Sequence, residues 1–152
     1  MNTASGLQLN LDAQHDCALQ LLGLLDSERN ALLANDVSSL ETLTLAKGEA
    51  AERMAGLGQK LERLRQSSGA AGVDTLIAAD GSGAARDRWA ALTTLADQCL
   101  RANQANAALL ASRQQQIRAA LQVLQPASAS QAVYGRGGHT GYHDGPRLLG
   151  QA

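Results

Sequence analysis

The sequence predicts an all-α protein: an elongated antiparallel helical bundle or coiled coil of three long helices, followed by a flexible C-terminal tail. Hydrophobic residues make up 45% of the 152 residues, yet aromatic residues make up only 2% and most of the apolar mass is Leu and Ala. Leu, Ala, Gln, Glu and Arg favour helices, whereas the β-branched residues that favour strands are scarce. Apolar residues also recur at the three- and four-residue intervals of amphipathic helices.

The first helix is predicted from Leu9 to Ala34, and the short connection Asn35-Asp36-Val37 follows it. A connection of this length predicts that the second helix packs antiparallel against the first as a hairpin. The apolar stripe of the first helix consists of Leu11, Ala18, Leu21, Leu22, Leu25, Leu32 and Leu33.

The second helix is predicted to begin at Ser38-Ser39-Leu40-Glu41, which has the pattern of a capping box, with Asp36 as a competing cap. Alternating steps of three and four then predict a seam that faces partner helices. Lys47 is the only charged residue in this seam. Its members are Leu40, Leu43, Lys47, Ala50, Met54, Leu57, Leu61 and Leu64.

A loop is predicted at 66–72 from its composition, and residues 73–79 have the length of one or two helical turns. The third helix is predicted from Ala84 to Gln125, just before Pro126. Its seam is expected to change phase near Arg113, at the polar run 113–116. The early seam consists of Trp89, Leu92, Ala96, Cys99, Asn103, Asn106 and Leu110.

These elements predict a helical bundle domain at 1–125 and a flexible tail at 126–152, which holds both prolines and many glycines. At about 1.5 Å per residue, a third helix of about 42 residues outruns a second helix of about 29 by about 13 residues. Ile117, Leu121 and Leu124 would then have no partner within the hairpin, and an uncovered apolar stripe suggests an interaction site. A tail that folds back over the stripe and a dimer formed through it are the alternatives.

Composition excludes several classes of function. The net charge of −1 disfavours nucleic-acid binders, which carry a basic excess. No run of about 20 apolar residues predicts a membrane span, and no secretory signal is recognised. We therefore expect a cytoplasmic protein in which Cys17 and Cys99 are reduced, buried and act as small apolar side chains.

No catalytic constellation is found, so we expect no enzyme activity and no cofactor. His139, His143 and Asp144 admit a metal-site reading, but useful spacing of the two imidazoles needs a helix, and glycines surround them. No metal is therefore predicted. Asn103 and Asn106 fall on seam positions of the third helix, where Asn either specifies register within the bundle or bonds to a partner helix.

The ordered pattern of the chain resembles the FlgN-like family of flagellar export chaperones over about Leu9 to Gly138. The matching residues are 21–32, then Asp36 with Leu40, Leu43 and Lys47, then 103–110 and the late Tyr134-Gly135-Arg136-Gly137. The alanine-rich third helix and Asn106-Ala107, where the family pattern has Asn followed by Gly, depart from it.

The resemblance implies a cytoplasmic, non-enzymatic chaperone. It would bind the C-terminal helical regions of flagellar hook-associated proteins, prevent their premature assembly and deliver them to the type III export apparatus. In the family, clients bind the C-terminal part of the chaperone, where the length argument also leaves the uncovered stripe. The candidate partner-binding residues are Asn103, Asn106, Leu110, Ile117, Leu121, Leu124, Val133 and Tyr134.

Two other classes of function fit the sequence. A self-associating structural or adaptor coiled coil would need no client and would use the late third helix to form a homo-oligomer. An RNA-binding regulator would use the arginines of the third helix and the Gly-Arg stretch of the tail, and its binding would depend strongly on salt.

Overall fold

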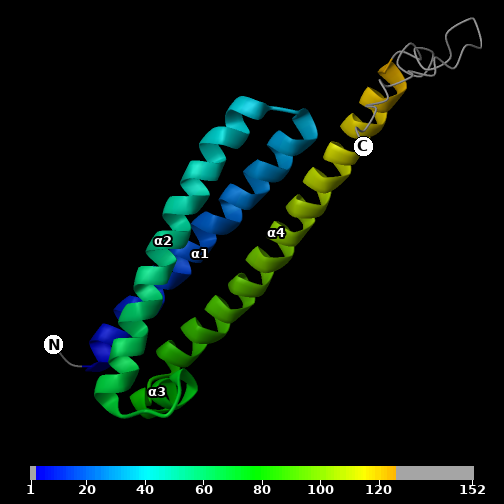
Figure 1. The fold of residues 1–152 in the computed structure, drawn as a ribbon. Coiled ribbons are helices and arrows are strands. Elements are labelled where there is room, and N and C mark those ends of the chain that lie inside the picture. The colour runs from blue at the N-terminus through cyan, green and yellow to red at the C-terminus, as the bar shows by residue number, and fades with distance from the viewer. Residues whose placement is uncertain (1–2, 126–152) are drawn as a thin grey trace, which may run out of the picture. The chain divides into compact units, whose positions relative to one another are not determined.

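The computed structural model describes residues 3–125, of which 92% are helical and none lies in a strand. The prediction of an all-α chain is confirmed for this range. Four helices follow one another (Figure 1): α1 Thr3–Ala34, α2 Val37–Ser68, α3 Val73–Asp80 and α4 Gly83–Leu124. The chain divides into two compact units at Arg113, with unit 1 at Met1–Arg113 and unit 2 at Gln114–Ala152. The predicted tail at 126–152 lies outside the described residues.

The turn between α1 and α2 is made by Asn35 and Asp36. Asn35 has a φ of 55°, a left-handed conformation that Asn tolerates better than most residues. Asp36 then caps α2, because its carboxylate accepts hydrogen bonds from the Ser39 amide at 3.1 Å and the Ser39 hydroxyl at 2.6 Å. The predicted start at a Ser38 capping box is therefore wrong, and the competing cap is the one used.

Replacing Asp36 by alanine is expected to lower the melting temperature by a few degrees, since the Ser39 amide loses its acceptor. Asp36→Asn keeps a capping oxygen and should lower the melting temperature less, and Ser38→Ala should have no effect.

The cap also depends on pH. The two hydrogen bonds from Ser39 lower the pKa of the Asp36 carboxyl from 3.8. The stabilisation is thus present above pH 3.8 and is lost as the pH falls below that value. Thermal melts followed by circular dichroism test this. A larger fall in melting temperature for Ser38→Ala than for Asp36→Ala would mean that the Ser38 capping box caps α2 after all.

The seam of α2 is confirmed, because all of its predicted members are buried or half-buried. The predicted loop at 66–72 begins too early, since α2 continues to Ser68. Gly69 ends the helix with a φ of 70°, a left-handed conformation that glycine adopts without steric cost. The amides of Gly69 and Ala70 donate to the Gln66 and Arg65 carbonyls at 3.2 Å each, which satisfies two terminal acceptors of the helix.

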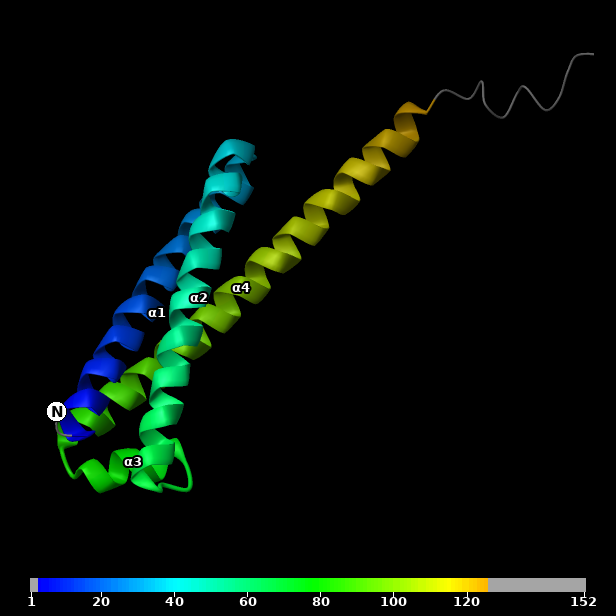
Figure 2. The ribbon, with the colours of Figure 1, turned by 60° about the vertical axis from the view of Figure 1, so that its left-hand side comes forward.

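The beginning of α1, the end of α2, α3 and the beginning of α4 lie together at one end of unit 1 (Figures 1 and 2), and much of the buried core comes from these segments. The short helix α3 contributes Leu76 and Ile77 to this core, so the predicted helical turns at 73–79 are confirmed and have a packing role. Leu33 of the predicted α1 stripe is instead 52% exposed. The buried cluster consists of Leu7, Leu11, Ala18, Leu61, Leu76, Ile77, Ala85, Leu92 and Leu95.

Within unit 1, α4 runs parallel to α1. Four contacts establish this, because the residue numbers on both helices rise together: Arg88 pairs with Asp12, Cys99 bonds to the Ala18 carbonyl, Asn106 to the Leu25 carbonyl and Arg113 to the Leu33 carbonyl. The first of these is a 2.7 Å ion pair between the basic α4 and the acidic α1.

The face that α4 turns toward α1 differs from the predicted seam. Its members are Ala85, Arg88, Leu92, Leu95, Cys99, Asn106 and Arg113, whereas Ala96, Asn103 and Leu110 of the predicted seam are exposed. Hydropathy misses this face because it includes Arg88 and Arg113, whose partners are on α1. The inward face stays in phase to Arg113, and α4 is one helix through 113–116. The phase shift expected beyond Arg113 stays a prediction, because residues 114–125 are all exposed.

Candidate functional site

The part of α4 that lies in unit 2, residues 114–124, is exposed throughout, and so is Gln125 after it. Ile117 is 61% exposed, Leu121 59% and Leu124 76%. We call these three residues the late α4 stripe. Apolar side chains on one face of a helix, with no cover among the residues described, have the character of a contact surface for another helix.

Val123 is 84% exposed, and the sequence reasoning did not single it out. It lies two residues after Leu121 and one before Leu124, so helical spacing puts it off the stripe. No signal in the sequence would have found it. Val133 and Tyr134, the remaining candidate residues, lie outside the described part of the chain.

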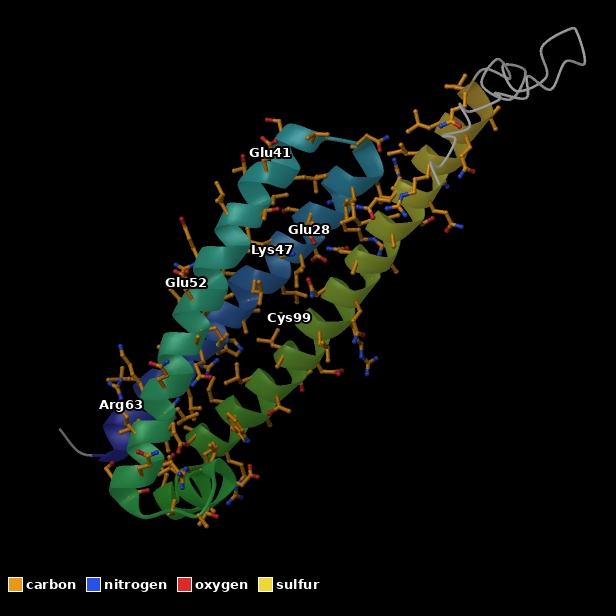
Figure 3. The ribbon with its side chains drawn as sticks, viewed as in Figure 1. Glu28, Glu41, Lys47, Glu52, Arg63 and Cys99 are labelled. Atoms are coloured by element: carbon orange, nitrogen blue, oxygen red, sulfur yellow. The ribbon has the colours of Figure 1, made fainter. Side chains whose placement is uncertain are left out.

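Four polar side chains join α1, α2 and α4 in unit 1, and we call them the polar cluster: Glu28, Lys47, Asn103 and Asn106. Lys47 Nζ donates to Glu28 Oε2 at 2.7 Å and to Asn103 Oδ1 at 3.5 Å. The Glu28 and Lys47 side chains, labelled in Figure 3, are only 13% and 24% exposed. The single charged residue of the α2 seam is thus paired with a carboxylate on α1.

Asn106 occupies the inner side of this cluster and is 3% exposed. Its amide nitrogen donates to the Leu25 carbonyl at 2.8 Å and to Glu28 Oε1 at 2.9 Å. Both amide hydrogens are therefore used within the chain, which is what a register-setting Asn requires. Asn103, three residues earlier, is exposed and keeps its amide hydrogens free of partners among the described residues. The two asparagines thus have different environments on one helix.

Two pockets in unit 1 are lined by residues of α1, α2 and α4, and together we call them the α2–α4 groove. Its first section, of about 480 Å³, lies beside Trp89 and Met54, and its second, of about 360 Å³, lies beside Lys47 and Leu110. Sequence reasoning did not find this groove, because its walls come from three separate helices. Its first section is lined by Gln14, Ala18, Leu21, Met54, Trp89, Leu92, Thr93, Ala96 and Cys99.

Cys17 and Cys99 are both buried and free, as expected. Their thiols donate to the carbonyls of Ala50 and Ala18 at 3.4 and 3.5 Å. Burial raises the pKa of the Cys99 thiol, and the nearby Asp26 charge raises it further. The reactive thiolate is therefore disfavoured at this position.

Other kinds of site have little support. No group of three His, Cys, Asp or Glu side chains within 3–125 is placed to hold a metal ion, and His139, His143 and Asp144 lie outside that range. Among the same residues, no helix has the length and hydropathy needed to cross a membrane. What the described residues do offer is apolar and mixed helix-facing surface.

Comparison with known proteins identifies the family. A family model described as FlgN protein matches residues 1–141, which is most of the chain. No curated protein and no solved structure matches. The resemblance seen in the sequence is therefore confirmed, and the chain belongs to the FlgN family of flagellar chaperones.

Proposed function

We propose that this protein is a cytoplasmic export chaperone that binds the C-terminal helical regions of flagellar hook-associated proteins. It keeps these clients unassembled and delivers them to the flagellar type III export apparatus. The observation that carries the proposal is the late α4 stripe, which is apolar, exposed and located in the C-terminal part of a FlgN-family chain.

The binding mode is a helix laid against a helix. A client's amphipathic segment places its apolar face on Ile117, Leu121 and Leu124. Val133 and Tyr134 are proposed as further client contacts and lie outside the described residues. The client surface that would otherwise drive polymerisation is occupied, so assembly is blocked until export.

The test is titration calorimetry with C-terminal peptides of the hook-associated proteins from the same organism. Saturable binding with a negative heat-capacity change is expected, because apolar surface is buried. The double variant Leu121→Asp/Leu124→Asp should weaken binding by about 100-fold or more, since two apolar contacts are replaced by charges without partners. Both residues are exposed, so circular dichroism should show nearly unchanged helicity.

The matched control is Ala119→Asp/Gln122→Asp. It adds the same two charges at the same spacing to exposed positions of the same helix, away from the stripe. It should leave affinity within about threefold, the size of ordinary surface effects. Equal losses in both variants would mean that charge alone acts, and undiminished binding in the stripe variant would contradict the proposed surface.

Self-association is the second candidate, because the exposure of the same stripe suits a second copy equally well. Sedimentation distinguishes the two functions. A stable oligomer that Leu121→Asp/Leu124→Asp converts to monomer, together with no affinity for the peptides, would assign the stripe to self-association.

A further inference from the structure

A second heptad stripe lies on α4 beside its inward face. Its members alternate by four and three residues, and all are exposed except Trp89, which is half-buried. We call them the outer seam. Six of them line the α2–α4 groove, and the seventh, Leu100, is 55% exposed. The outer seam consists of Trp89, Thr93, Ala96, Leu100, Asn103, Ala107 and Leu110.

This spacing specifies the shape of an occupant. A seam with alternating steps of three and four residues packs against another helix, whose side chains enter the holes that the seam leaves. Ala96 and Ala107 provide such holes, because their side chains are small. The facing wall supplies the matching apolar surface from α2 and α1, including Leu40, Met54 and Leu21.

The polar cluster specifies the chemistry of the occupant at one level of the groove. Both Glu28 oxygens are already used, one by Lys47 and one by Asn106. Lys47 carries three protons and has two acceptors in unit 1, and the second, Asn103 Oδ1, is 3.5 Å away. An occupant side chain at this level therefore faces the Lys47 ammonium and the exposed Asn103 amide. A carboxylate or amide oxygen could accept hydrogen bonds from both.

We infer that the α2–α4 groove docks an amphipathic helix of the client, with a Glu or Gln of that helix facing Lys47 and Asn103. The inference rests on the proposed client binding and adds a second contact surface, in unit 1. Within unit 1, the seven-residue interval of Trp89, Ala96, Asn103 and Leu110 favours a helix with a heptad repeat as the occupant.

Trp89, the single tryptophan of the chain, gives a direct readout of groove occupancy, because it lines the groove. It stands 28 positions before Ile117, the first residue of the late α4 stripe, in the sequence. Titration with the client peptides should shift Trp89 emission to shorter wavelength with the dissociation constant that calorimetry gives. The double variant Ala96→Arg/Ala107→Arg should weaken peptide binding by about tenfold or more, since long side chains fill the groove. Both positions are exposed, so the fold should tolerate the change.

The matched control is Ala90→Arg/Ala105→Arg, which adds the same charge to exposed α4 positions outside the groove and should leave affinity unchanged. Suppose that the peptides bind, that Trp89 emission does not change, and that Ala96→Arg/Ala107→Arg leaves the affinity unaltered. This result would overturn the proposal that the groove binds the client, but not the proposal for the late α4 stripe. Peptides that bind nowhere would overturn both. A groove variant that lowers the sedimenting mass, with peptide affinity intact, would make the occupant a second copy and overturn the client assignment.

The predicted acceptor is tested by replacing each Glu and Gln of the peptide by Ala in turn. One replacement should weaken binding to the unaltered protein but have a smaller effect on the Asn103→Leu variant, because the two side chains interact. Coupling at none of the positions would overturn the placement of the acceptor at the polar cluster.

Discussion

Replacing Leu11 by alanine is expected to lower the free energy of unfolding by about 3–4 kcal/mol, because the change leaves a cavity in a core that collapses only partly around it. Leu11 is 0% exposed and belongs to the cluster that joins all four helices. A loss of this size is a large fraction of the stability of an ordinary domain. The Leu11→Ala variant would therefore be much closer to unfolding, and the groove depends on the folded state.

The matched control for this prediction is Leu9→Ala, two residues earlier on the same helix. Leu9 is 58% exposed, so the same substitution should change stability by no more than about 0.5 kcal/mol. Urea denaturation followed by circular dichroism measures both, provided that the slopes of the transitions agree. Equal losses at the two positions would show that the core does not lie where the fold places it.

Replacing Glu28 by leucine is expected to lower the free energy of unfolding by about 2 kcal/mol. The change removes two contacts at once: Lys47 Nζ loses its 2.7 Å carboxylate partner, and Asn106 loses the acceptor of one amide hydrogen. The cost is smaller than for a fully buried pair, because the Lys47 side chain is 24% exposed and its ammonium can turn to water.

A double-mutant cycle with Lys47→Met isolates the ion pair. The double variant Glu28→Leu/Lys47→Met should be more stable than Glu28→Leu alone, because replacing both charges avoids leaving an unpaired cation in the seam. Stability is again measured by urea denaturation. Strict additivity of the two single losses would mean that Glu28 acts through Asn106 alone.

The helical class and the α2 seam follow from local spacing, and the structure agrees with both. The long helices were also expected, but a fourth, short helix, α3, lies between the second and the third of them. The first helix had its inward stripe largely right: Leu11, Ala18, Leu25 and Leu32 are buried, and only Leu33 is exposed beyond half. Leu7 was missed because the predicted helix began at Leu9, two residues too late to include it. Helix ends are set by caps and packing as much as by periodicity.

The candidate site was predictable in part. The length of the third helix pointed to residues after Arg113, and the unit boundary falls at that residue. The apolar character of Ile117, Leu121 and Leu124 and their spacing were visible in the sequence, and their exposure is visible only in the structure. Val123 was not predicted as a contact residue, because its position in the helix places it off the stripe.

Spacing alone therefore identified the helices and the hairpin, because a 3.6-residue period and short connections are properties of neighbouring residues. The family came from the resemblance of residue motifs, and the family model confirms it. The tertiary structure decided which face of α4 turns inward. The predicted seam combined three members of the inward face, Leu92, Cys99 and Asn106, with members of the outer seam such as Trp89 and Leu110. The pairing of Arg88 with Asp12 and the bonds of Asn106 to α1 set which of these face inward. Such contacts join residues about eighty positions apart, so local periodicity does not encode them, and they leave the outer seam open on the α2–α4 groove.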